Sequence, residues 1–175
     1  MIDQANPQTL ATHTGFTFLL RTVQPGDEPL LSDFFSRVTP EDLRFRFLRA
    51  VKHVSHQQLM AMENVDHAHS ETFLALSPEG ELLAVAMLAA DDALERAEVA
   101  LSIRPEFKNR GVSWSMLDRI VQFAEARGIG WLESIENREN VAAISLEREM
   151  GFVAEPIAGD PCEVVLRLRL PIERH

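Results

Sequence analysis

The stretch AEVALSI at residues 97–103, the stretch KNRGVS at residues 108–113 and the amphipathic segment after them decide the fold of this chain. Residues 97–103 are apolar and strand-like. From Gly111 to Arg127 the apolar residues recur at helical spacing, which predicts a helix with one buried stripe. A strand, a short loop with glycine and a helix, in this order, form a unit that can bind phosphate.

The loop has the chemistry that phosphate recognition requires. The first amide groups of a helix have no partner within it and carry partial positive charge, and Gly111 lets a phosphate approach the backbone closely. Arg104, Lys108 and Arg110 add positive charge to a chain whose net charge is −10. The alternative interpretation is that Gly111 forms only a tight turn and that the basic side chains are solvated.

The pattern outside this unit predicts one α/β domain. Alternating or short apolar runs predict strands, and helical spacing or capping residues predict helices. We expect strands at 15–23, 71–76, 81–89, 95–103, 131–135 and 162–170, and helices at 30–38, 43–48, 55–62, 111–127 and 140–151. These elements predict one α/β domain in which the strands at 71–76, 81–89 and 95–103 form an antiparallel meander and helices flank the sheet. Residues 1–14 are expected to be a flexible tail, and residues 15–175 a single domain.

Composition narrows the function. The chain has 175 residues, 46% of them hydrophobic, which suits one globular domain. It shows no secretion signal and no long apolar run, and its single cysteine fits a reducing compartment, so we expect a cytoplasmic protein with no membrane segment. A net charge of −10 argues against a nucleic-acid partner and weakly favours a cationic one.

The loop and the segments beyond it carry a family resemblance. Lys108, Gly111 and Ser113 stand where the GCN5-related N-acetyltransferase (GNAT) superfamily has the pattern Arg/Gln-x-x-Gly-x-Gly/Ala. The later features Ala-Arg-Gly-Ile at 126–129, Asn140 at the start of a helix and Glu-Met-Gly-Phe at 149–152 are also similar to that superfamily. Residues 45–48 and 52–55 are similar to the acetyltransferase domain of bacterial Pat-type protein lysine acetyltransferases.

The resemblance implies the α/β acyl-CoA N-acyltransferase fold, a mixed, mainly antiparallel central sheet of about seven strands flanked by helices. It also implies acetyl-CoA as co-substrate and no metal. The activity it implies is transfer of an acetyl group to a primary amine, either of a small molecule or of a protein lysine. The backbone of residues 101–103 would hold the pantetheine arm, and the loop would hold the pyrophosphate. The implied cofactor-binding residues are Leu101, Ser102, Ile103, Lys108, Arg110, Gly111, Val112, Ser113 and Asn140.

Glu98 is the candidate general base. An amine is almost fully protonated at neutral pH and must lose a proton before it attacks a thioester, which gives a carboxylate a clear task. Strand alternation places Glu98 on one face with Ala100 and Ser102, whose small side chains leave room for a substrate. The alternative interpretation is a structural carboxylate, either solvated or paired with Arg21.

The chain contains no tyrosine. Many enzymes of the family protonate the departing thiolate with a tyrosine, and the corresponding position here is Glu147. This absence keeps a second hypothesis open, namely a catalytically silent sensor or regulatory module that binds acetyl-CoA. The oligomeric state is also open, and a homodimer is one alternative because many relatives dimerise.

Two histidines, His67 and His69, are the nearest approach to a metal-binding pattern. A stable site needs more ligands than two imidazoles, and no cysteine or further histidine cluster accompanies them. We therefore expect no metal site and assign this segment to a loop near the substrate entrance.

Overall fold

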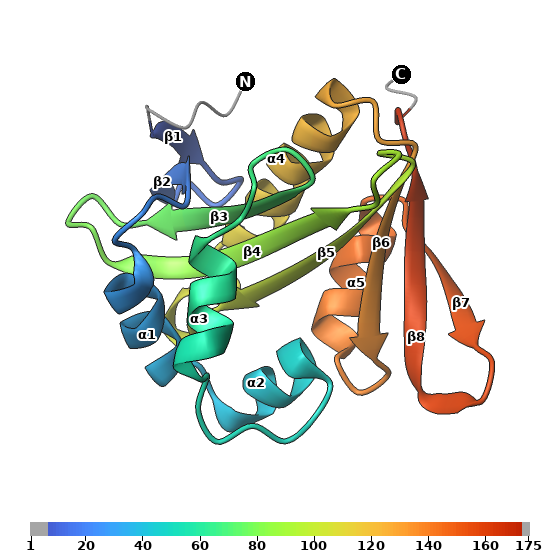
Figure 1. Cartoon of the computed structure of the whole chain (residues 1–175), viewed down its shortest axis with the longest axis horizontal. Helices are drawn as coiled ribbons and strands as arrows, with labels where there is room; N and C mark the ends of the chain where they lie inside the picture. The colour runs from blue at the N-terminus through green and yellow to red at the C-terminus, as the bar shows by residue number, and fades with distance from the viewer. Residues whose placement is uncertain (1–6, 173–175) are drawn as a thin grey trace.

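Eight strands form one sheet in the order β1-β2-β3-β4-β5-β6-β8-β7 (Figure 1). The structure is a computed structural model and is described for residues 7–172. The strands are β1 (Gln8–Ala11), β2 (Thr17–Thr22), β3 (Ser70–Leu76), β4 (Leu82–Ala90), β5 (Arg96–Ile103), β6 (Trp131–Asn137), β7 (Val153–Ile157) and β8 (Asp160–Arg169). All neighbouring pairs are antiparallel except β5 and β6, so the predicted mixed, mainly antiparallel sheet is confirmed.

The helices cover both faces of this sheet. They are α1 (Glu28–Ser36), α2 (Pro40–Phe47), α3 (His56–Glu63), α4 (Val112–Ala126) and α5 (Val141–Glu149), with a short 3-10 turn at Pro105–Phe107. Helices α1 to α3 pack over one apolar cluster, and α4 lies on the opposite face (Figure 1). Strand β3 shows the division, because Phe73 belongs to the α4 side and Leu74 to the other side.

Strands β5 and β6 separate after a short parallel ladder. Their pairing runs from Arg96 opposite Trp131 to Glu98 opposite Glu133. Beyond that point β5 continues along β4 as far as Ile103, whereas β6 continues along β8. Figure 1 shows the two strands diverging toward the lower edge of the sheet. One edge of the later part of β5 is therefore left without a neighbouring strand.

The N-terminal segment differs from the prediction. Gln8–Ala11 forms strand β1, which pairs with β2, so the expected flexible tail is wrong for this part of residues 1–14. Residues 1–6 of the expected tail lie outside the described residues. The strand was missed because it has four residues and one buried apolar side chain, Leu10, which is too little for a periodic signal. Strand β7 was not predicted either, so the sheet has eight strands where about seven were expected.

Helix α4 is anchored on the sheet by its apolar stripe. Met116 and Ile120 are fully buried, and Phe123 meets Phe73 of β3 edge-to-face with ring centroids 5.1 Å apart. The helix begins after Gly111, whose φ of 83° is left-handed, and ends before Gly128. The position of the loop before α4 therefore depends on this packing.

We expect Phe73→Ala to lower the free energy of unfolding by about 3–5 kcal/mol, because it removes a fully buried ring and leaves a cavity under α4. Urea denaturation measures the change. Val153→Ala is the control, since Val153 is 63% exposed on β7. Equal losses in the two variants would contradict the anchoring role.

Candidate active site

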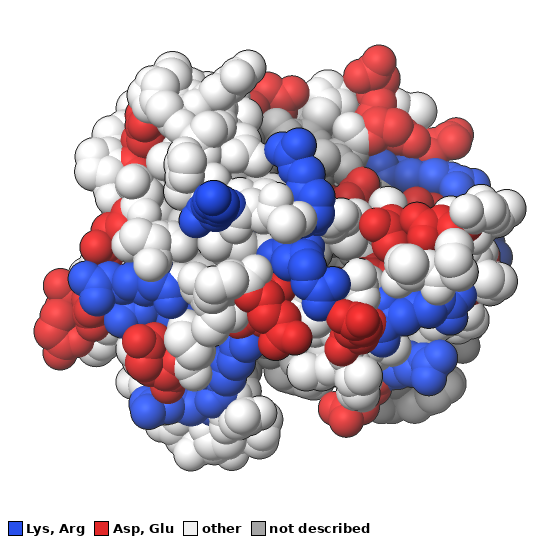
Figure 2. All heavy atoms as spheres, turned by 90° about the horizontal axis from the view of Figure 1, so that it is seen from below, with Lys and Arg blue, Asp and Glu red and all other residues white. Residues whose placement is uncertain are grey.

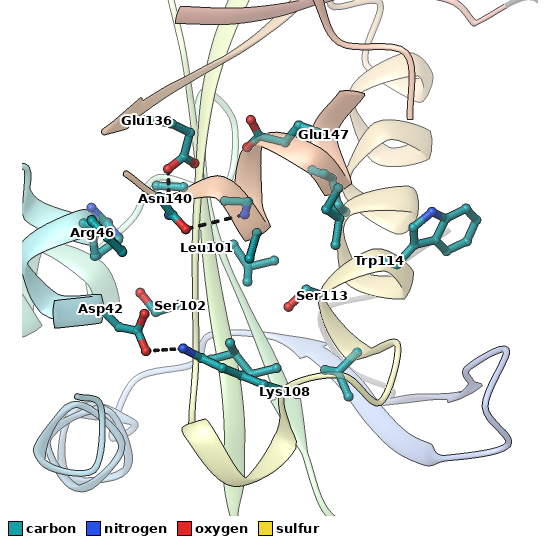
Figure 3. A pocket seen from close by; sticks show the side chains of 18 of the residues that line it. Asp42, Arg46, Leu101, Ser102, Lys108, Ser113, Trp114, Glu136, Asn140 and Glu147 are labelled. Atoms are coloured by element: carbon teal, nitrogen blue, oxygen red, sulfur yellow. Dashed lines mark hydrogen bonds and ion pairs between the residues drawn. The ribbon is translucent and has the colours of Figure 1, made fainter. Parts of the chain in front are cut away.

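A cavity of about 480 Å³ opens where β5 and β6 separate (Figure 3). Its walls come from α2, β5, the loop before α4, the first turns of α4, β6 and α5. Segments more than 90 residues apart in the chain therefore meet here. The predicted cofactor residues on its wall are Leu101, Ser102, Ile103, Lys108, Gly111, Val112, Ser113 and Asn140.

Arg110 is the predicted cofactor residue that does not line the cavity. Its guanidinium lies over the rings of Phe16 and Phe107, 5.3 and 5.5 Å from their centroids. Its carbonyl oxygen accepts a hydrogen bond of 2.7 Å from Thr14 Oγ1. Arg104, the other arginine that the sequence placed near the loop, is buried and pairs with Glu81 and Glu106.

The start of α4 lies at the cavity, and its first backbone amides have no partner within the helix. The first backbone hydrogen bond of the helix runs from the Ser115 amide to the Gly111 carbonyl, so the amides of residues 112–114 precede it. Val112 and Ser113 line the cavity beside Gly111. The arrangement has the partial positive charge and the open amides that an anion requires.

The N-terminal segment packs against this loop. A Cβ atom added at Gly111 would lie 2.9 Å from the His13 ring and 2.9 Å from Thr12 Cβ, so the two segments of the chain are in contact at this point. His13 also lines the cavity. Sequence reasoning missed His13, and no local signal could have revealed it, because the contact joins segments about a hundred positions apart.

Lys108 connects the loop to α2. Its ammonium group forms an ion pair with Asp42, and both side chains line the cavity (Figure 3). Asp42 is held in place by the first turn of α2, where its amide donates to the Thr39 cap. An anion that enters the cavity would compete with Asp42 for Lys108.

Glu98 lies at the last paired position of β5 before the strands separate. Its side chain is exposed and does not line the cavity wall. The alternative pairing with Arg21 is wrong, because Arg21 binds Asp27 at 2.7 Å. The charge of Glu98 acts on Arg46 of α2: burial lowers the pKa of Arg46, and the negative charges of Glu98 and Glu136 act in the opposite direction.

Two further carboxyl groups, Glu136 and Glu147, lie at the inner end of the cavity. Glu136 accepts hydrogen bonds of 3.0 Å from Ser134 Oγ and of 3.0 Å from Asn140 Nδ2. Glu147 is only 6% exposed, and its buried Oε2 has no hydrogen-bond partner among residues 7–172. Sequence reasoning missed Glu136, because its neighbourhood is built by α2 and α5.

The surroundings of Glu136 and Glu147 act differently on the pKa values of the two carboxyl groups. Burial, and then the charge of Glu136, raises the pKa of Glu147 to about 8. Burial also raises the pKa of Glu136, while its hydrogen bonds and the charge of Arg46 oppose that rise. The surroundings therefore favour the protonated form of Glu147, whereas the hydrogen bonds of Glu136 and the charge of Arg46 favour the ionised form of Glu136.

The histidine segment holds no metal-binding cluster in the structure. His67 Nδ1 lies 2.9 Å from Glu71 Oε2, and His69 Nδ1 lies 3.2 Å from Asp66 Oδ2. No group of three or more possible ligands occurs among the described residues. A search of the same residues finds no helix long and apolar enough to cross a membrane.

A sheet in which two parallel strands, here β5 and β6, separate beside the start of a helix is typical of acyl-CoA N-acyltransferases. The sequence pattern of the "Acetyltransferase (GNAT) family" matches residues 35–152, which is more than half of the chain. The chain therefore belongs to this family and is an N-acetyltransferase.

Individual relatives agree with this assignment. A protein named Acetyltransferase PA5475 from Pseudomonas aeruginosa is 27% identical over 155 residues, covering 87% of this chain and 83% of that protein. The GNAT domain of S. lividans PAT superimposes with a TM-score of 0.87 at 21% identity, covering 94% and 97% of the two chains. Spermidine N-acetyltransferase from Vibrio cholerae, solved in complex with CoA and spermine, gives a TM-score of 0.70 at 18% identity, with 87% and 95% coverage.

The raised pKa of Glu147 predicts a pH-dependent stability. In the unfolded chain this carboxyl ionises near 4.5, whereas in the folded chain it ionises near 8. Below the lower value it is protonated in both states and costs nothing; as the pH rises toward the upper value, ionisation increasingly favours the unfolded chain. We expect the melting temperature of the wild type to fall between pH 5 and pH 8 more than that of Glu147→Gln. Parallel melting curves across this range would contradict the assignment.

Proposed function

We propose that this N-acetyltransferase binds acetyl-CoA in the cavity and transfers the acetyl group to a primary amine, with Glu98 as general base. The observation that carries the proposal is the cavity itself: it opens at the end of the β5–β6 ladder, and the start of α4 forms part of its wall. A strand edge and a helix start are thus available to one extended, phosphorylated ligand.

The cofactor arm would lie along β5. Leu101 and Ile103 pair with β4 on one side only, and within residues 7–172 no strand pairs with the other side of β5 after Glu98. Backbone groups on that free edge can bind a pantetheine chain as a further strand would. The pyrophosphate would then rest on the amides at residues 110–113, with Lys108 released from Asp42 as the competing cation.

The side-chain amide of Asn140 is already hydrogen-bonded within the protein, which limits its contact with the cofactor. Its Oδ1 accepts from the Ala143 amide at 3.5 Å as the cap of α5, and its Nδ2 donates to Glu136. Both groups are thus used within the protein, so a contact with the cofactor would exchange one of these bonds. We propose that Asn140 mainly fixes the start of α5 on the cavity wall.

Glu98 would accept the proton of the attacking amine. The amine nitrogen forms a bond to the thioester carbonyl carbon, its excess proton passes to Glu98 directly or through water, and the C–S bond then breaks with the electron pair on sulfur. Backbone amides of β5 would stabilise the oxyanion. The exposed position of Glu98 at the end of the ladder supports access for an acceptor that arrives from solvent.

The acceptor is proposed only as a primary amine, of a small molecule or of a protein lysine. The net charge of −10 favours a cationic acceptor. Figure 2 shows acidic and basic side chains interspersed on one face of the molecule, so on this face no broad acidic surface marks a docking area. Selection of an ammonium group would then depend on individual carboxylates near the cavity.

A catalytically silent module that binds acetyl-CoA is the second candidate. The lack of tyrosine favours it, since the chain has no phenol to protonate the leaving thiolate. Such a module would bind acetyl-CoA, leave every amine unreacted and be insensitive to Glu98→Gln. Turnover with any amine decides between the two.

We expect Gly111→Ala to abolish or strongly weaken acetyl-CoA binding in calorimetric titration. The new Cβ would lie 2.9 Å from His13 and Thr12 and displace the loop, in addition to a left-handed backbone cost of about 1–2 kcal/mol. Gly128→Ala is the matched control, because it has a similar φ of 75° with nothing within 4 Å of the new atom. If both variants bind acetyl-CoA as the wild type does, the loop is not the pyrophosphate site.

We expect Glu98→Gln to lower kcat about 10²- to 10⁴-fold while the affinity for acetyl-CoA stays unchanged, because the amide cannot accept the proton. Steady-state kinetics and calorimetry measure the two quantities. Glu79→Gln, in the exposed turn between β3 and β4, carries the same chemical change away from the cavity. An unaltered kcat in Glu98→Gln would remove this residue from the mechanism.

A further inference from the structure

We propose that Glu147 donates the proton that neutralises the departing CoA thiolate, and that Glu136 is the positioning residue that keeps the proton on Glu147. The inference rests on the proposed function, because it assigns the second proton transfer of the same reaction. It gives a donor to a chain that has no tyrosine.

The placement of Glu147 supports this role. Asn140, Ala143 and Glu147 all line the cavity, which shows that one face of α5 is turned toward it. In Figure 3 the Glu147 carboxyl is directed into the space between α5 and β6, where Glu136 lies. Leu101 of β5, whose backbone is proposed to hold the pantetheine, lines the same cavity. A thioester held along β5 would thus have Glu147 across the cavity from it.

Hydrogen bonding decides which acid holds the proton. Glu136 receives two donors, Ser134 and Asn140, and has the positive charge of Arg46 beside it. Ser134 also acts on Glu147 through a hydrogen bond that lowers its pKa, but burial outweighs it, and the buried Oε2 of Glu147 has no partner among residues 7–172. Burial that is only partly compensated by hydrogen bonds favours the neutral form of this carboxyl, which has a proton to give.

The charged groups around Glu147 come from β6, α2, β5 and its own helix α5. Glu136 on β6 faces it directly, Arg46 on α2 acts on Glu136, and Glu98 on β5 acts on Arg46. An exposed acid, Glu149, lines the cavity on α5 itself. The buried positive charge of Arg46 thus acts on Glu136 and Glu98 and is not among the causes that shift the pKa of Glu147, which favours Glu147 as the neutral acid.

The acidity of Glu147 suits a thiolate. A thiol ionises near 8.5, and a donor of comparable pKa transfers a proton efficiently. When the C–S bond breaks, the sulfur takes the electron pair and bonds to the Glu147 proton, which leaves a Glu147 carboxylate. Glu98 meanwhile holds the proton from the amine, and exchange with water returns both acids to their starting states.

The test compares wild type, Glu147→Gln and Glu79→Gln in pH profiles of kcat, with acetyl-CoA affinity measured by calorimetry. In the wild type kcat should fall on the alkaline side as Glu147 loses its proton. In Glu147→Gln we expect kcat to fall about 10²-fold with affinity within about 2-fold, and the alkaline decline to disappear. Glu79→Gln should follow the wild type.

Glu136→Gln separates proton donation from packing. Removing the negative charge of Glu136 lowers the pKa of Glu147, so the alkaline decline should move to lower pH while Glu147 remains in place. Carbon-13 NMR of the glutamate carboxyl groups, assigned with Glu147→Gln, follows the same titration in the resting protein. A Glu147 signal that titrates near 4.5 would overturn the proposal even if the variants fold poorly.

The outcomes distinguish this inference from the proposed function. A wild type that acetylates an amine while Glu147→Gln keeps both its kcat and its alkaline decline overturns the donor role alone. A wild type that binds acetyl-CoA and acetylates no amine overturns the proposed reaction and the donor role with it.

Discussion

The separation of β5 from β6 is the constraint on which the rest of the structure depends. Three paired positions hold the strands together, and each strand then follows a different neighbour. The gap would expose apolar surface, and α4 and α5 flank it with their apolar stripes turned toward the sheet. Helix α4 must therefore start at the gap, which is why an amide-rich helix start and a free strand edge meet in one cavity.

The parts of the site that are local in sequence were predictable. The strand, the loop with Gly111 and helix α4 follow from periodicity and from the special backbone that a left-handed glycine permits. Arg104 was wrongly predicted to add positive charge to the loop. In the folded chain it forms ion pairs with Glu81 and Glu106, which the sequence pattern does not indicate. His13 and Glu136 were missed, since long-range packing alone brings them to the cavity.

The charged side chains that line the cavity are divided between its two ends. An ion-paired lysine, Lys108, lies at the end where phosphate would bind, and two acids lie at the end where the chemistry would occur. Keeping Glu147 neutral lets the second acid stay buried next to Glu136 without two full negative charges. The same arrangement costs stability at alkaline pH, which is a common property of sites that tune a proton donor.

A crystal structure of the protein with acetyl-CoA tests the central claim most directly. The account predicts the pyrophosphate on the backbone amides at residues 110–113, the pantetheine along the free edge of β5 at residues 101–103, and the thioester sulfur within hydrogen-bonding reach of Glu147. Acetyl-CoA bound elsewhere, or a sulfur held away from the Glu136 and Glu147 end of the cavity, would contradict it.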